Sequence, residues 1–140
     1  MTCILRAGGT DFDVDVFVAT SALIPHSIWR RGASRYPQAS PGGDRHDTSG
    51  LSVLVSKAEF SDLSLQVADA VEFLRLHHDA VQALASGSSV ESVTLDFGVE
   101  MSWPSWPSFT FPQELLSLSG SAGVAVCLSV YPAEAGARDD

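Results

Sequence analysis

The chain has 140 residues, of which 45% are hydrophobic and 18% charged, and a formal net charge of −9 at pH 7. This length suits one domain with one core, and the apolar content excludes a mainly disordered or fibrous protein. The excess of acidic residues excludes nucleic acid and anionic membranes as expected partners, because both attract Lys and Arg.

The start of the chain and its cysteines indicate a cytoplasmic protein. No apolar run reaches the roughly 20 residues that span a bilayer, and residues 1–6 lack the basic start and apolar middle of a signal peptide. Cys3 and Cys127 fit no paired metal or redox spacing, so we expect reduced thiols. We expect one domain over residues 1–140, with its core at 10–132 and a frayed tail at 133–140.

The first predicted element is a strand over residues 12–18. Apolar side chains alternate there with acidic ones, in the run Asp11, Phe12, Asp13, Val14, Asp15, Val16, Phe17 and Val18. A period of two is typical of a half-buried strand. The three aspartates lack the turn glycine and closing acidic residue of a calcium loop. A short helical turn is expected between Thr20 and Ile28, limited by Pro25.

Residues 32–50 form the longest predicted loop, because Gly, Pro, Ser, Arg and Asp gather there without periodicity. Loops of this length in a compact domain are often functional.

The second half of the chain predicts a regular series of elements. Residues 51–56 and 93–101 alternate as strands, and residues 124–131 form the last strand. Between the first two, apolar residues at three- and four-residue spacing predict a helix from Leu63 to Leu84, capped by Ser61 or Asp62. A short helix follows at 112–118, with proline in its first turn.

This order predicts an α+β two-layer sandwich of ferredoxin-like type, in which helices cover one face of a mostly antiparallel four-stranded sheet. An open sheet face requires water or a partner to cover it, and we expect Phe17, Leu95, Phe97 and Val99 on that face.

The chain also resembles the uncharacterised bacterial family called domain of unknown function 4279. The segments that carry the resemblance are the aromatic early strand, Leu23-Ile24-Pro25 before Trp29-Arg30-Arg31-Gly32, Met101-Ser102-Trp103, Phe111 to Leu116, and Val130-Tyr131-Pro132. The Trp103 to Pro107 turn departs from it by its proline and tryptophan content. The resemblance implies a small bacterial protein of similar fold, and it brings no activity, cofactor or catalytic residue.

Two aromatic segments are the candidate binding residues. Four of the eight basic residues lie within residues 30–45, and this patch comprises Trp29, Arg30, Arg31, Arg35, Tyr36 and Arg45. Arginine and aromatic side chains dominate binding hot spots. The alternative is that these arginines pair with Asp11, Asp13 or Asp15. Trp103 and Trp106 form the second segment, and capping of the core is the alternative there.

The sequence contains no standard catalytic, phosphate-binding or metal-binding motif, so no cofactor, metal or catalytic residue is assigned. Convergence of His26, His46, His77, His78 or Cys3 in space stays open.

The favoured interpretation is a non-catalytic protein-binding module, for example an immunity-type inhibitor of a basic toxin. Two alternatives stay open. One is a small-ligand-binding or hydrolytic enzyme with its site at residues 26–46, and the other is a structural homo-oligomer such as a homodimer.

Overall fold

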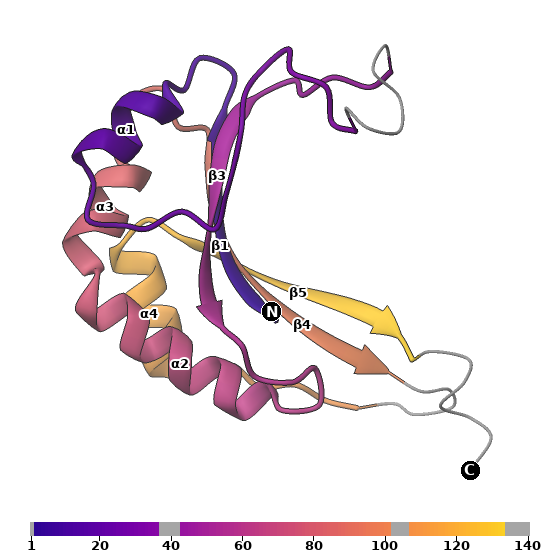
Figure 1. The fold of residues 1–140 in the computed structure, drawn as a ribbon. Coiled ribbons are helices and arrows are strands. Elements are labelled where there is room, and N and C mark those ends of the chain that lie inside the picture. Colours follow the sequence, from indigo (N-terminus) through magenta and orange to yellow (C-terminus); the bar gives the residue numbers. More distant parts are fainter. Residues whose placement is uncertain (1, 37–42, 102–106, 134–140) are drawn as a thin grey trace.

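The computed structural model describes residues 2–36, 43–101 and 107–133. It has one five-stranded sheet, and four helices of the described residues lie on one side of that sheet (Figure 1). Trp103, Trp106, the middle of the predicted loop and most of the predicted tail lie outside the described residues.

The sheet confirms the α+β class but not the predicted strand number. Its strands are β1 (Cys3–Gly9), β2 (Ser27–Trp29), β3 (Ser49–Ser56), β4 (Ser92–Met101) and β5 (Ala125–Pro132), in the spatial order β2-β3-β1-β4-β5. The first four strands pair antiparallel, whereas β5 is parallel to β4. The prediction of a mostly antiparallel four-stranded sheet is therefore wrong in its strand number, and the sheet is a mixed one with a single parallel pairing among the described strands. A helix connects β4 to β5, and such a crossover brings a strand back in the same direction.

The predicted strand over residues 12–18 is wrong, because helix α1 (Val14–Thr20) occupies most of it. The side chain of Asp13 caps this helix by accepting a hydrogen bond from the backbone N–H of Val16 at 3.2 Å. Val14 is buried, and Phe17 and Val18 pack against the core at helical spacing, while Val16 is exposed. The alternation of aspartate with apolar residues, which is typical of a strand, therefore occurs here at the start of a helix.

The predicted helical turn between Thr20 and Ile28 is also wrong. Helix α1 ends at Thr20, and the segment then extends into β2. Two strands, β1 and β2, were not predicted. In β1, Cys3, Leu5 and Ala7 are buried at alternate positions. The buried core thus includes residues before position 10.

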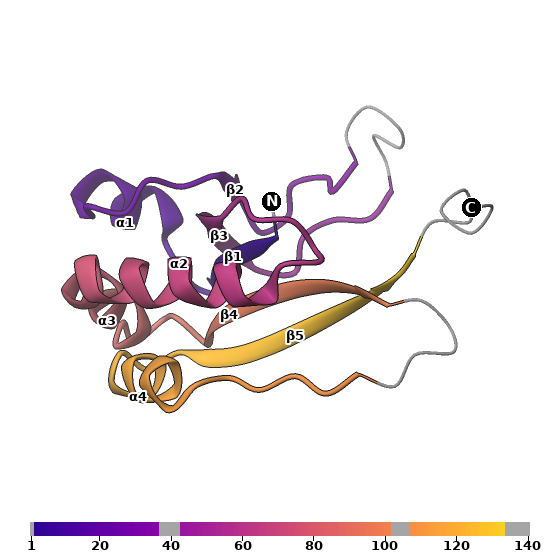
Figure 2. The same ribbon diagram turned by 90° about the horizontal axis from the view of Figure 1, so that it is seen from below.

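The helices and strands after residue 50 confirm the predicted elements, except that the long predicted helix is divided in two. The predicted helix over 63–84 consists of α2 (Leu63–Leu76) and α3 (His78–Ala85), separated at His77. Asp62 caps α2 by accepting from the backbone N–H of Leu65 at 3.1 Å. The short helix is α4 (Gln113–Ser121). Figure 2 shows that the helices gather over one end of β4 and β5, whose other ends extend beyond them.

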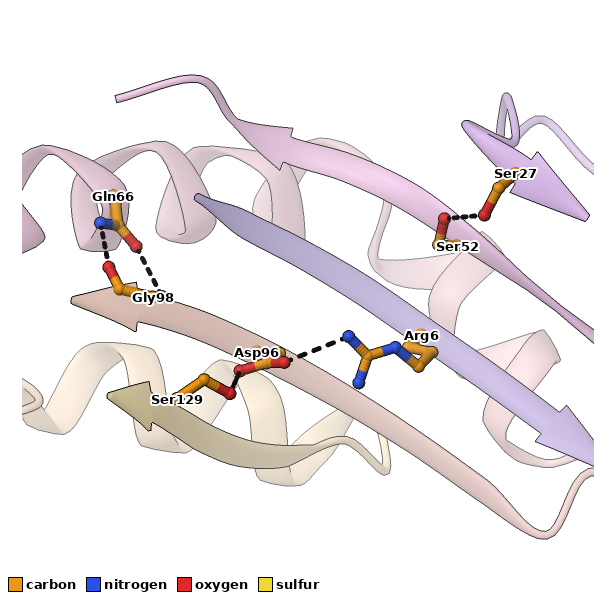
Figure 3. A network of polar contacts seen from close by, with 7 residues as sticks. All are labelled: Arg6, Ser27, Ser52, Gln66, Asp96, Gly98 and Ser129. Carbon is orange, nitrogen blue, oxygen red and sulfur yellow. Dashed lines mark hydrogen bonds and ion pairs between the residues drawn. The ribbon is translucent and has the colours of Figure 1, made fainter. Parts of the chain in front are cut away.

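The core lies between the helices and the sheet. Leu95, Phe97 and Val99 are buried on the helix side of β4, and Phe17 lies in α1 against the core. The predicted place of these four residues on the open sheet face is therefore wrong. Gln66 of α2 is fully buried beside β4. Its side-chain amide donates to the carbonyl of Gly98 at 2.8 Å and accepts from the Gly98 N–H at 3.2 Å, which ties α2 to the sheet (Figure 3).

Candidate functional site

The candidate site is the sheet face that the helices leave uncovered, here called the open face. Alternate residues of a strand point to opposite sides, so the neighbours of core residues lie on this face. The strand register and the hollows described below place these residues on it: Ile4, Arg6, Gly8, Ser27, Trp29, Ser52, Leu54, Thr94, Asp96, Gly98, Cys127, Ser129 and Tyr131.

A chain of polar contacts crosses the open face from β5 through β4 to β1 (Figure 3). The hydroxyl of Ser129 donates to Oδ1 of Asp96 at 2.7 Å, and Nη2 of Arg6 donates to Oδ2 of Asp96 at 3.2 Å. Asp96 is only 8% exposed, whereas the Arg6 side chain is 47% exposed. A buried carboxylate requires such partners, and in return it fixes the position of the Arg6 guanidinium.

Trp29 lies flat on the open face because two glycines leave room for it. A Cβ atom on Gly50 would lie 2.3 Å from Cζ2 of Trp29, and one on Gly8 would lie 3.6 Å from the same atom. The indole Nε1 donates to the hydroxyl of Thr48 at 3.3 Å. Beside this ring, Ser27 and Ser52 share a hydrogen bond of 2.5 Å that links β2 to β3 (Figure 3).

A second aromatic side chain covers a glycine at the other end of the face. A Cβ atom on Gly98 would lie 2.8 Å from Cε1 of Phe60. The ring of Phe60 meets that of Tyr131 edge to face at 5.5 Å between centroids. The open face therefore has an aromatic group fixed near each end.

Two hollows lie on the open face, and Arg6 lines both of them. The larger has a volume of about 430 Å³ and is bordered by Trp29, Glu91, Thr94 and Cys127, among others. The smaller has a volume of about 170 Å³ and is bordered by Phe60, Tyr131 and Asp96, among others. Such shallow hollows suit the side chains of a protein partner better than a buried substrate.

Of the basic patch predicted at residues 29–45, only Trp29 is placed among the open-face residues. Arg30 makes a two-pronged ion pair with Asp15, with Nε–Oδ2 at 3.0 Å and Nη2–Oδ1 at 2.6 Å. The hydrogen bond from Arg30 lowers the pKa of Asp15 below its ordinary value. Arg31 lies 3.8 Å from Asp11. Pairing with these aspartates, the alternative interpretation, is confirmed for both arginines.

The remaining residues of the patch belong to the loop between β2 and β3. Nη1 of Arg45 donates to the carbonyl of Gly32 at 2.7 Å, and Nε of Arg35 donates to the carbonyl of Arg45 at 3.4 Å. Tyr36 is exposed. These arginines hold the two sides of the loop together, which is a structural use of their charge.

Three of the four histidines make separate side-chain contacts. The ring of His46 lies 6.4 Å from Trp29, that of His77 packs on Phe73 at 4.8 Å, and Nε2 of His78 lies 3.0 Å from the hydroxyl of Ser121. Across residues 2–36, 43–101 and 107–133, no group of three His, Cys, Asp or Glu side chains gathers in a way that suits a metal ion.

The two cysteines differ in surroundings. Burial raises the pKa of the Cys3 thiol, and nearby Asp96 and Asp69 add to the effect. Cys127 is exposed and borders the larger hollow.

The sequence analysis did not name three residues of this polar chain as candidate site residues: Arg6, Asp96 and Ser129. A usable signal existed, because Asp96 stands between Leu95 and Phe97, and Arg6 between Leu5 and Ala7. A charged residue between two buried positions of a strand must lie on the opposite face.

Comparison with protein-family models, with curated proteins and with solved structures found no match to this chain. The resemblance to domain of unknown function 4279 therefore stays a prediction. Within the described residues, no helix has the length and apolar character needed to cross a membrane.

Proposed function

We propose that this chain is a non-catalytic protein-binding module and that the open face is its contact surface. The observation that supports this most directly is that polar and aromatic groups are fixed on the sheet face that the helices of the described residues leave uncovered. Arg6 is held in place by Asp96, and Trp29 is seated on glycines. Fixed aromatic and arginine side chains lose little entropy on binding, which favours their use as anchors.

The partner proposed is a basic protein. The net charge of −9 accelerates association with a positively charged surface and opposes association with an acidic one. An immunity-type inhibitor that covers a basic toxin in the bacterial cytoplasm fits this chemistry.

A ferredoxin-like arrangement, with β5 added to it, is proposed for the part from β1 to β4. Two observations support it. Along the chain the elements follow the order β1, α1, β2, β3, α2 with α3, and β4, and the four strands pair antiparallel in the spatial order β2-β3-β1-β4.

A second candidate function is the binding of a small ligand, favoured by the volume of the larger hollow. This hollow is lined by Trp29, the last residue of β2, and by Thr48 in the loop before β3, whereas Arg30 and Arg31 pair with aspartates. A site at residues 26–46 would therefore use Trp29 and not these two arginines. The homodimer stays a prediction.

The experiment is affinity purification of the tagged chain from its source cells with matched variants. Thr94→Arg places a long cationic side chain in the larger hollow, and Ser117→Arg makes the same type of change on the exposed side of α4. We expect a specific partner that Thr94→Arg loses and Ser117→Arg retains. Retention by Thr94→Arg together with loss by Ser117→Arg would place the contact on the helices, and the absence of any partner would argue against a binding module.

A further inference from the structure

The larger hollow, here called the Trp29 hollow, combines an aromatic ring with a carboxylate. Trp29 and Glu91 both line it. Glu91 accepts a hydrogen bond from the backbone N–H of Thr10 at 3.2 Å. Hydrogen bonds from the side chain and backbone of Thr10 lower the pKa of Glu91, so this carboxylate is ionised at neutral pH.

The charges around this hollow sum to a negative value. Arg6 is the only basic residue that borders it among the described residues, and Asp96 at 3.2 Å offsets the charge of Arg6. Glu91 has no basic partner among the ion pairs of the described residues. The hollow therefore attracts cations and repels anions.

We propose that the Trp29 hollow receives an arginine or lysine side chain of the basic protein partner. This inference rests on the proposed function and names the chemistry of its central contact. The face of a tryptophan ring attracts cations, and a nearby carboxylate strengthens the attraction. The missing side chains of Gly8 and Gly50 let the ring lie against the sheet, and its hydrogen bond to Thr48 orients it, so the site exists before the partner arrives. The net charge of −9 favours the same class of partner.

The test uses small probes on the full chain and needs no identified partner. Blocked arginine (Nα-acetyl-arginine methylamide) is titrated and followed by amide and indole N–H chemical shifts. Blocked glutamate and blocked alanine serve as probes of opposite and zero charge. We expect saturable shifts at the Trp29 indole, Glu91 and Thr94 with blocked arginine alone.

A matched pair of variants identifies the carboxylate. Glu91→Gln keeps an acceptor for Thr10 and removes the charge, so we expect it to weaken arginine binding roughly two- to fivefold. Glu72→Gln, an exposed position on α2, makes the same change away from the open face and should leave binding unchanged.

Saturable binding of blocked glutamate, equal effects of the two variants, or no arginine-dependent shift would each overturn the inference. These outcomes are separate from those of the purification, since a partner lost by Thr94→Arg would still support the open face as the contact surface.

Discussion

The two faces of the same sheet carry different kinds of residues. On the helix side, Leu5, Leu95 and Phe97 are fully buried, and on the open side the neighbouring residues Arg6 and Asp96 form an ion pair. Adjacent positions of one strand thus serve opposite purposes. Burial of apolar area on the helix side stabilises the fold. The open side is not needed for that burial, so it can carry polar and charged groups that serve binding.

The largest expected contrast is between two positions of β4 that point in opposite directions. Leu95→Ala should lower the free energy of unfolding by about 2–5 kcal/mol because it leaves a cavity in the core. Thr94→Ala, one residue away on the open face, should change it by less than about 1 kcal/mol. Urea denaturation of both variants measures the difference, and equal losses would show that the open face is also part of the core.

Gln66 tests the polar link between the helices and the sheet. Gln66→Leu should cost about 1–3 kcal/mol, because the buried carbonyl of Gly98 loses its donor. Gln82→Leu is the matched control, since Gln82 is exposed and makes one bond of 3.3 Å to the carbonyl of Ser121. Similar stabilities of the two variants in thermal denaturation would argue against the link.

Gly50 tests the seating of Trp29. Gly50→Ala places a methyl group against the indole and the carbonyl of Ala7, so we expect a loss of about 1–3 kcal/mol and a shift of the Trp29 indole resonance. Gly120→Ala is the control, because a Cβ atom there meets nothing within 4 Å. An unshifted Trp29 resonance in Gly50→Ala would contradict the described position of the ring.

The Arg6–Asp96 pair should contribute less. Arg6→Met leaves Asp96 with Ser129 alone, but Arg6 is half-exposed, so we expect a loss of about 1 kcal/mol. Arg75→Met breaks a pair with Glu114 in which both side chains are more than half exposed, and the expected loss is smaller. Chemical denaturation distinguishes them, and the reverse order would mean that Asp96 is not shielded from water.

The smallest expected effect concerns pH and the pair of Arg30 with Asp15. Because the pKa of Asp15 is lowered in the folded protein, the stability from this pair is present above the ordinary aspartate pKa. It is lost as the pH falls through the lowered folded value. Arg30→Gln should raise the pKa of Asp15 in an NMR titration, whereas Arg35→Gln should leave it lowered. An unchanged pKa in Arg30→Gln would exclude the pair in solution.

The sequence predicted correctly those elements whose apolar spacing fits only one type of secondary structure. The three- and four-residue spacing in α2 and the alternation in β4 are of this kind, and both predictions were confirmed. The apolar residues within 12–18 fit the period of a strand and also the spacing of a helix. In the structure they form a helix, and Asp13 caps its first turn. In β1, Ile4 interrupts the polar side and two glycines end the strand, so the alternation of Cys3, Leu5 and Ala7 was not recognised as a strand.

The open face was less predictable because it depends on strand register. Arg6 faces Thr94 across the β1–β4 pair, which makes Asp96 its diagonal neighbour. One residue of register shift would separate Arg6 from Asp96. The sequence allowed the pairing of Arg30 and Arg31 with the early aspartates as an alternative. Only the fold shows that these pairs form and that both arginines lie outside the candidate site.

Site-directed crosslinking tests most directly whether the open face is the contact surface. Cys127 borders the Trp29 hollow and a label there would block it, whereas Leu54 lies on the open face and borders neither hollow. Because Cys3 is fully buried, a thiol-reactive benzophenone labels the variant Cys127→Ser with Leu54→Cys at position 54. The control carries Cys127→Ser and Ser117→Cys, which moves the label to α4. In extracts of the source cells we expect one protein adduct from the label at position 54 and none from the control. An adduct from the control alone would contradict the account.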